Sequence, residues 1–310
     1  MRIVLSDKKL DKERMPSDIE VRAVTYKELD KYANDPDVVA IAGSRAMAIK
    51  CADIEMPSLK LFQLTSAGFD GVPCEKYEQR GIAVANAGNV YSAPIAETVV
   101  FGILSSAKKL RSNINNRHFK ITRGYDLITE LQGKRVLIMG AGNIGTAVAS
   151  RLAGFDMTVD GYDPYCSEKP QYNRIIRSVD ELYSAAGEYD YIVSTMPDNE
   201  QTRKFIGKDL ISRLSSSAVI VNVGRRAVFD ESALYDALKS KKIGGAVLDM
   251  FEKLPNPITN KFRRLKNVMV LPGVAAISRE VNERLSKHMT DNVIASLCGE
   301  KISNVINGVK

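Results

Sequence analysis

Tryptophan is absent from the 310 residues of the chain, which also holds only two histidines and four cysteines. The cysteines are widely separated and form no C-x-x-C pair, so we expect reduced thiols rather than a disulfide framework or a zinc site. No segment approaches the roughly 18 consecutive apolar residues that span a bilayer. The start, MRIVLSDKKL, lacks the apolar core and cleavage site of a signal peptide. We therefore expect a cytoplasmic protein with no membrane partner and no metal.

The chain also has only a small excess of positive charge. It contains 44 Lys and Arg and 37 Asp and Glu, which gives a net charge of +7. The basic clusters 108–111, 239–242 and 261–266 fall in segments predicted as helices or loops. We interpret them as solvated faces and expect no nucleic-acid partner. The chain has no G-x-S-x-G elbow that would indicate a hydrolase with a serine nucleophile.

Short apolar runs alternate with amphipathic stretches along most of the chain, which is typical of repeated βαβ units. Most runs are apolar on both faces, as expected for parallel strands covered by helices on either side. The length exceeds what one core usually serves. The sequence therefore predicts an α/β fold with two doubly wound parallel-sheet domains. The expected strands are 2–5, 38–42, 60–64 and 81–85 in the first domain, and 135–139, 158–162, 190–195, 217–223, 243–249 and 267–271 in the second.

Two longer segments predict helices near the domain junctions. Apolar residues recur at helical spacing within 93–112, after Pro94, which predicts a long helix that crosses between the domains. A second amphipathic stretch, 280–298, follows the last expected strand and would return the chain to the first domain.

The most informative motif is a glycine turn between an expected strand and an expected helix. Gly140, Gly142 and Gly145 follow the apolar run 135–139 with the spacing G-x-G-x-x-G. In such turns the first glycine allows the tight turn, the second lets a pyrophosphate approach the backbone, and the third lets helix and strand pack closely. The free N–H groups at the helix start then bind phosphate.

An acidic residue completes this pattern, since Asp163 ends the next expected strand at about the usual interval of 20 residues. Its carboxylate can accept hydrogen bonds from the ribose hydroxyls of a dinucleotide and would repel a 2′-phosphate. Pro164 and Tyr165 follow, with no arginine to bind that phosphate. The motif favours NAD over NADP. A glycine turn with a surface aspartate in an unrelated α/β domain is the alternative, and the combination of strand, helix and acid argues against it.

Taken together, the motifs resemble those of the D-isomer-specific 2-hydroxyacid dehydrogenase family, in the family's order and over nearly the whole chain. The resemblance implies a Rossmann NAD-binding domain and a flavodoxin-like substrate domain, with the substrate in the cleft between them. It also implies a homodimer and a small anionic 2-oxo or 2-hydroxy acid as substrate. The domains would comprise residues 1–93 with 279–310 for the substrate and 94–278 for NAD. The segments that carry the resemblance are 59–73, 81–97, 131–145, 194–207, 221–234, 248–257 and 291–307.

The resemblance also implies roles for individual residues. Arg225 matches the family's catalytic arginine, whose guanidinium would bind the carboxylate and carbonyl oxygens of the substrate. Arg226 beside it leaves some ambiguity, which the motif register settles in favour of Arg225. The backbone amides of Ala67 and Gly68 would hold the substrate carboxylate. Further cofactor contacts would come from Asn143, Ile144, Pro197, Thr202, Val223, Gly224 and Asp249.

One expected catalytic group is missing. Glu252 matches the glutamate that orients the family's acid–base histidine, but Gly273 stands where that histidine would follow Pro272. His118 and His288 do not match the position, and both are interpreted as ordinary surface or packing residues. Three hypotheses remain: a reductase in which Glu252 donates the proton through water, a reductase that borrows a group such as His118 of a second subunit, and an NAD(H)-binding sensor or scaffold with little turnover.

Overall fold

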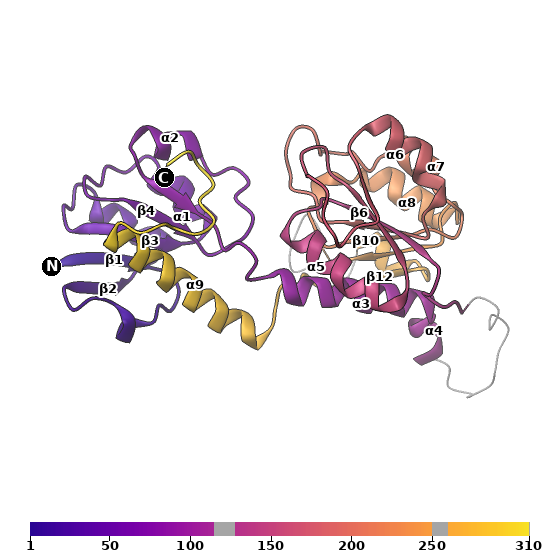
Figure 1. Ribbon diagram of the computed structural model, residues 1–310, viewed down its shortest axis with the longest axis horizontal. Coiled ribbons are helices and arrows are strands. Elements are labelled where there is room, and N and C mark those ends of the chain that lie inside the picture. Colours follow the sequence, from indigo (N-terminus) through magenta and orange to yellow (C-terminus); the bar gives the residue numbers. More distant parts are fainter. Residues whose placement is uncertain (115–127, 250–259, 310) are drawn as a thin grey trace. The chain divides into compact units, whose positions relative to one another are not determined.

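The computed structural model describes residues 1–114, 128–249 and 260–309 (Figure 1). The chain divides into two compact units. The first comprises Met1–Tyr91 together with Ser278–Lys310, and the second comprises Ser92–Ile277. Glu252 and His118 lie outside the described residues.

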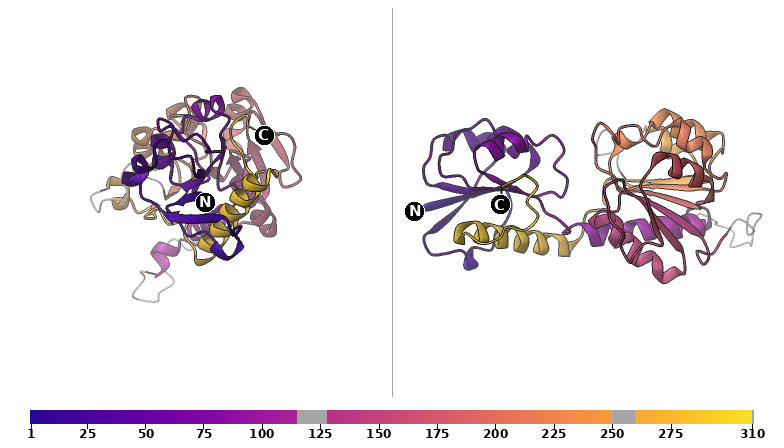
Figure 2. Two further views of the ribbon diagram at one scale, coloured as in Figure 1. Left: turned by 90° about the vertical axis from the view of Figure 1, so that its left-hand side faces the viewer. Right: turned by 45° about the horizontal axis from the view of Figure 1, so that its top comes forward.

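The first unit contains a five-stranded sheet in the order β2-β1-β3-β4-β5, and every pair of neighbouring strands is parallel. This is the flavodoxin-like order, in which the chain reverses its direction of winding between β1 and β3. Helices cover both faces of the sheet (Figure 2). The elements are β1 (Arg2–Ser6), β2 (Ile19–Ala23), β3 (Val38–Gly43), α1 (Arg45–Cys51), β4 (Leu61–Leu64), α2 (Cys74–Gln79), β5 (Ala83–Ala85) and α9 (Arg279–Cys298).

The C-terminal helix α9 closes one face of this sheet. It buries Val281, Leu285, Met289 and Val293, which recur every four residues and therefore share one side of the helix. They belong to the same core cluster as strand residues such as Leu61. The predicted helix 280–298 is confirmed, and it lies in the first unit.

The second unit contains a seven-stranded parallel sheet in the order β12-β11-β10-β9-β6-β7-β8. The winding reverses between β6 and β9, and this is the Rossmann order with one additional strand. In such sheets ligands bind beyond the carboxyl ends of the strands at this reversal. The elements are α3 (Ser92–Ala107), α4 (Leu110–Ile114), β6 (Arg135–Met139), α5 (Asn143–Leu152), β7 (Thr158–Tyr162), β8 (Arg174–Ile176), α6 (Val179–Ala185), β9 (Tyr191–Ser194), α7 (Lys208–Arg213), β10 (Val219–Asn222), α8 (Glu231–Lys239), β11 (Gly245–Leu248) and β12 (Val268–Val270).

The predicted fold class is confirmed, because both units are doubly wound parallel α/β sheets. Two strands were missed, β2 and β8. Both lie at a sheet edge, where one side of the strand is open to solvent and a continuous apolar run is not needed. None of the helices in the described residues is long and apolar enough to cross a membrane.

The predicted helix over 93–112 is wrong in length. The helix α3 ends at Ala107, and a short separate helix, α4, begins at Leu110. Lys109 between them has φ +50°, a left-handed conformation that ends an α-helix. Lysine at such a position is uncommon, which is why the apolar spacing alone did not predict the break.

Candidate functional site

The glycine turn lies at the carboxyl end of β6, next to the reversal of the sheet. Gly140 has φ +97°, and a Cβ there would lie 2.9 Å from Oγ1 of Thr195. A Cβ on Gly145 would lie only 2.1 Å from the carbonyl oxygen of Gly140, so any side chain at this position is excluded. Side chains at both positions would therefore meet neighbouring atoms of the turn.

At Gly142 the surroundings are open, because no neighbouring atom of the described residues lies within 4 Å of the place where its Cβ would be. Gly142 is the N-cap of α5, which starts at Asn143 and runs for 10 residues. The first N–H groups of a helix have no partner within the helix and carry its positive dipole end. The open space and the helix start together fit the pyrophosphate of a dinucleotide.

Asp163 is tied to this turn more closely than the sequence indicated. Its Oδ2 accepts the N–H of Ala141 at 3.0 Å, and its Oδ1 accepts the N–H of Tyr165 at 3.0 Å. From the same loop, Nζ of Lys169 donates to the carbonyl of Ala141 at 2.6 Å. The acid is therefore fixed beside the turn, with a cation nearby that sequence reasoning missed. Nothing in the spacing of Lys169 indicated this contact.

A buried tyrosine lies beside the start of α5. The hydroxyl of Tyr172 lies 3.0 Å from the place of a Cβ on Gly145. Burial raises the pKa of Tyr172, so its hydroxyl stays protonated.

The loop after β9 is held by its own side chains. Oγ1 of Thr202 donates to the carbonyl of Pro197 at 2.7 Å and accepts the N–H of Asn199 at 3.0 Å. Pro197 and Thr202, both predicted cofactor contacts, therefore belong to one compact turn. This turn follows a strand that borders the reversal of the sheet.

The segment after β10 passes close to the end of β9. The N–H of Val223 donates to the carbonyl of Ser194 at 3.3 Å. A Cβ on Gly224 would lie 3.1 Å from the carbonyl oxygens of Ser194 and Met196, a tight contact that glycine avoids. The structure thus brings the predicted residues Val223 and Gly224 to the carboxyl end of the sheet.

Arg225 and Arg226 differ in their surroundings. Nη1 of Arg225 donates to the carbonyl of Gly224 at 3.3 Å, and the residue is half-buried at the carboxyl end of β10. Arg226 instead forms an ion pair with Glu231, with 2.7 Å between Nε and Oε1. The carboxylate of Glu231 therefore binds the guanidinium of Arg226.

Asp249 organises the segment in which the histidine was expected. Its carboxylate is buried, with Oδ1 accepting the N–H of Val274 at 2.9 Å and Oδ2 accepting the N–H of Ala275 at 3.0 Å. Gly273, directly before them, has φ +78°. Asp249 thereby holds this segment against the end of β11.

In the first unit, the turn with Ala67 and Gly68 follows β4. Oγ of Ser66 donates to the carbonyl of Gly68 at 2.7 Å, and Nδ2 of Asn86 donates to the carbonyl of Ala67 at 2.9 Å. Within the described part of the chain, the N–H groups of Ala67 and Gly68 donate to no acceptor. Two adjacent free amides can bind a carboxylate.

Comparison with known proteins decides the family. Residues 98–275, more than half of the chain, match the profile of the D-isomer specific 2-hydroxyacid dehydrogenase NAD binding domain. The chain belongs to the D-isomer specific 2-hydroxyacid dehydrogenase family. Its second unit accordingly has the fold and the sequence pattern of that family's NAD-binding domain.

Relatives extend the similarity to nearly the whole chain. A D-3-phosphoglycerate dehydrogenase of Methanocaldococcus jannaschii is 30% identical over 92% of the chain, which spans only 54% of that relative's length. A glyoxylate/hydroxypyruvate reductase B of Enterobacter agglomerans is 30% identical over 82% of the chain and 80% of the relative. Among solved structures, an NADPH-dependent glyoxylate/hydroxypyruvate reductase of Sinorhizobium meliloti, in complex with NADP and malonate, matches with a TM-score of 0.79 and 26% identity over 99% of this chain and 97% of that one.

In the ranges that the structure describes, no group of three or more His, Cys, Asp or Glu side chains is placed to hold a metal ion.

Proposed function

We propose that the protein is an NAD-dependent oxidoreductase that interconverts a small 2-oxo acid and its D-2-hydroxy acid. The observation that carries the proposal is the glycine turn after β6, where Gly142 leaves open space at the start of α5. Membership of a dehydrogenase family supports the same reaction class.

The residues that would hold the cofactor belong to the second unit. The amides at the start of α5 would bind the pyrophosphate, and the segments at Pro197, Thr202, Val223 and Asp249 would border the nicotinamide. Bound NADH supplies the hydride. The chain's own contribution is to orient the nicotinamide and to exclude competing reactions.

Substrate binding is assigned to one charged side chain and two backbone groups. The guanidinium of Arg225 would bind the carboxylate and polarise the carbonyl, because its planar fork matches two oxygens. The N–H groups of Ala67 and Gly68 would hold the carboxylate. Because the guanidinium would act on the reacting carbonyl, a change at Arg225 should lower kcat as well as raise KM.

Cofactor preference is proposed as NAD over NADP. The carboxylate of Asp163 adjoins the glycine turn, and it would repel the 2′-phosphate of NADP while accepting ribose hydroxyls. The related reductase of Sinorhizobium meliloti is NADPH-dependent, so the preference needs its own test. We expect a lower Kd for NADH than for NADPH in a fluorescence titration, and a smaller difference in Asp163→Ser.

The proton donor is proposed to be Glu252 acting through water, because Gly273 offers no side chain. Loss of a positioned general acid lowers a rate by about 10² to 10⁴, and hydride positioning and electrostatics remain. Arg225 and Glu252 are both present, which favours an enzyme over a sensor or scaffold that binds NAD(H) without turnover. A group from a second copy, such as His118, is the other candidate, and a homodimer remains a family-based expectation.

One assay separates these possibilities. NADH oxidation is measured with glyoxylate, hydroxypyruvate, pyruvate and phosphohydroxypyruvate for the wild type, Glu252→Gln, His118→Ala and Gly273→His. We expect wild-type turnover that Glu252→Gln abolishes and His118→Ala leaves intact. Intact NADH binding without wild-type turnover, together with activity in Gly273→His, would replace the enzyme proposal by the sensor.

A further inference from the structure

The helix α9 carries a polar stripe beside its apolar one. Arg284, His288 and Asn292 recur every four residues and therefore lie on one side of the helix. All three contact backbone or side-chain groups of the first unit's loops and strands. The contacts are Arg284 with the carbonyl of Val90 at 3.1 Å, His288 with the carbonyl of Asn86 at 3.0 Å, and Asn292 with Gln63 at 2.6 Å and the carbonyl of Ser303 at 2.9 Å.

The hydrogen-bond roles around His288 follow from its neighbours. The carbonyl of Asn86 can only accept, so Nε2 of His288 donates to it. Nδ2 of Asn292 lies 3.4 Å from Nε2, but its two hydrogens already go to Gln63 and Ser303. His288 therefore carries its proton on Nε2 and directs it at Asn86.

Asn86 contacts both His288 and the turn that is proposed to hold the substrate carboxylate. Its Nδ2 donates to the carbonyl of Ala67 at 2.9 Å, and its Oδ1 accepts the N–H of Gly88 at 2.9 Å. Next to it, the N–H of Ala87 donates to the carbonyl of Ser66 at 3.0 Å. Asn86 is thus restrained through both its backbone and its side chain. The carbonyl of Ala67, to which it donates, lies in the same peptide plane as the N–H of Gly68, so this hydrogen bond fixes that plane.

We propose that His288 is a positioning residue for the turn of Ala67 and Gly68, acting through Asn86. The proposal rests on the proposed function, because it takes this turn as the carboxylate site. An amide donor holds an anion only if its peptide plane points at it, so a peptide that can rotate binds more weakly. His288 anchors the segment that fixes the plane, from a helix that comes more than 200 residues later in the chain.

The test uses one helix and three variants. His288→Ala removes the donor, His288→Gln replaces it with an amide of similar reach, and Lys287→Ala is the matched control. The side chain of Lys287 is 71% exposed on the same turn and pairs with Asp291 rather than with the 86–90 segment. Malonate binding in the presence of saturating NADH is measured by calorimetry, together with KM and kcat for glyoxylate, the Kd of NADH and the melting temperature.

We expect His288→Ala to raise the malonate Kd and the glyoxylate KM about fivefold, as the loss of one hydrogen bond predicts. The Kd of NADH should stay unchanged. His288→Gln should return both values to within about twofold of the wild type, and Lys287→Ala should match it.

Malonate binding tests the positioning role of His288, whereas turnover tests the proposed reaction. If malonate binds with wild-type affinity to a folded His288→Ala, or if wild type binds no malonate, the positioning role is wrong. Should His288→Ala melt before the assay temperature, the malonate Kd of Asn86→Asp decides, since a wild-type value in that variant also overturns the role. Altered malonate binding without turnover by any variant would leave the positioning role and remove the proposed reaction.

Discussion

The carboxylate of Asp249 accepts the backbone N–H of Ala275, with 3.0 Å between Oδ2 and the nitrogen. Its other oxygen accepts the N–H of Val274. One buried side chain thereby fixes two successive peptide groups in the segment that follows Gly273. The family resemblance assigned Asp249 to the cofactor, and the structure gives its carboxylate a second task that the sequence did not reveal.

Asp249→Asn should destabilise the protein, because one oxygen becomes an NH₂ group that faces a backbone N–H. An unsatisfied buried donor costs about 1–3 kcal/mol, so the free energy of unfolding should fall by that amount. Urea denaturation measures it, and amide exchange at Val274 and Ala275 should quicken. Asp236→Asn, at an exposed position of α8, is the control and should leave the unfolding midpoint unchanged. Equal midpoints for both variants would contradict the anchoring role.

Two glycines of the turn after β6 should respond differently to alanine. Gly145→Ala should prevent native packing, because its Cβ would meet the carbonyl oxygen of Gly140 at 2.1 Å. Gly142→Ala has room for its methyl group, and its extended backbone suits alanine, so its stability should fall by no more than about 1 kcal/mol. That methyl group would occupy the space proposed for the pyrophosphate. We therefore expect NADH binding to weaken at least about tenfold, which corresponds to 1.4 kcal/mol.

Melting curves and NADH fluorescence titrations measure both effects in parallel. A folded Gly142→Ala with wild-type NADH affinity would place the pyrophosphate elsewhere. A Gly145→Ala as stable as the wild type would show that the turn relaxes around a side chain.

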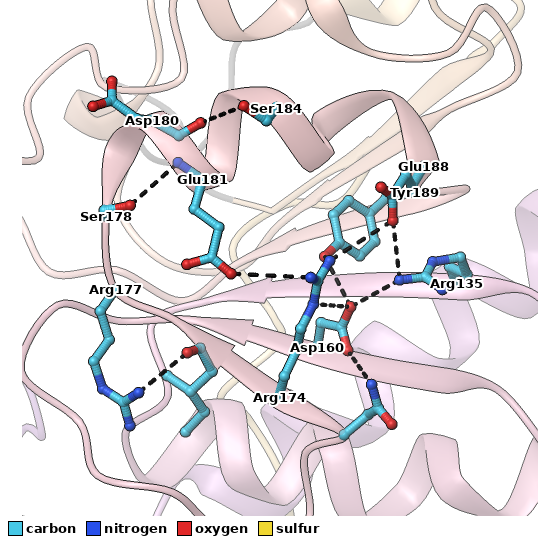
Figure 3. Close-up of polar contacts among 12 residues, drawn as sticks. Arg135, Asp160, Arg174, Arg177, Ser178, Asp180, Glu181, Ser184, Glu188 and Tyr189 are labelled. Atoms are coloured by element: carbon cyan, nitrogen blue, oxygen red, sulfur yellow. Dashed lines mark hydrogen bonds and ion pairs between the residues drawn. The ribbon is translucent and has the colours of Figure 1, made fainter.

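Asp160 lies at the centre of a cluster of charged side chains in the second unit (Figure 3). Its fully buried carboxylate pairs with Arg135 and Arg174, each at 3.1 Å, and accepts the hydroxyl of Tyr189 at 2.9 Å. Burial is the main reason why the pKa of Tyr189 rises to about 12. Arg135 and Arg174 are the first residues of their strands, so the cluster lies toward the amino ends, opposite the glycine turn.

Asp160→Asn should lower the free energy of unfolding by about 2 kcal/mol, less than the 3–5 kcal/mol for a wholly buried pair, because both arginines reach solvent. The Kd of NADH should not change. Chemical denaturation and the fluorescence titration measure the two quantities. Glu181→Gln is the control, because this half-exposed carboxylate lies 3.9 Å from Arg174 and should contribute little. An Asp160→Asn that binds NADH more weakly but unfolds like the wild type would reverse this assignment.

Asp7, which follows β1, should make stability depend on pH. Its Oδ2 accepts the N–H of Ser44 at 3.0 Å, whereas Oδ1 is buried with no partner among the described residues. Burial raises the pKa of Asp7, so the folded protein binds the proton more tightly than the unfolded chain does. The stabilisation is therefore complete below the unfolded pKa and is lost as the pH rises through the folded pKa.

Asp7→Asn stays neutral at every pH. It should melt above the wild type at pH 7, and the difference should disappear near pH 3. Thermal melts at the two values measure this. A variant that melts below the wild type at pH 7 would show that the ionised carboxylate stabilises the fold.

The central strands could be predicted because both of their faces are buried under helices, and the glycine turn because its spacing is specific. The run 38–42 is apolar throughout, and the run 135–139 is apolar after Arg135. A Cβ at Gly140 or Gly145 would meet a neighbouring atom at less than 3 Å. The edge strands β2 and β8 lack that signal, since β2 is nowhere fully buried and β8 has only three residues.

Side-chain partners in the site could not be predicted from spacing. The contact of Lys169 with the carbonyl of Ala141 depends on how one loop folds over another. His288 was expected to be an ordinary surface or packing residue, and its bond to Asn86 joins segments that are distant in the chain. Such contacts are set by tertiary structure, and a single sequence carries no period that marks them.

The left-handed backbone at Gly273 bears on any attempt to engineer activity into the protein. A side chain at this φ costs about 1–2 kcal/mol, although histidine tolerates it better than β-branched residues do. An imidazole introduced at 273 therefore arrives together with a distorted backbone, and a poor rate in Gly273→His would have two possible sources. Gly273→Ala carries the same backbone penalty without the imidazole, so the difference between the two variants isolates the effect of the ring.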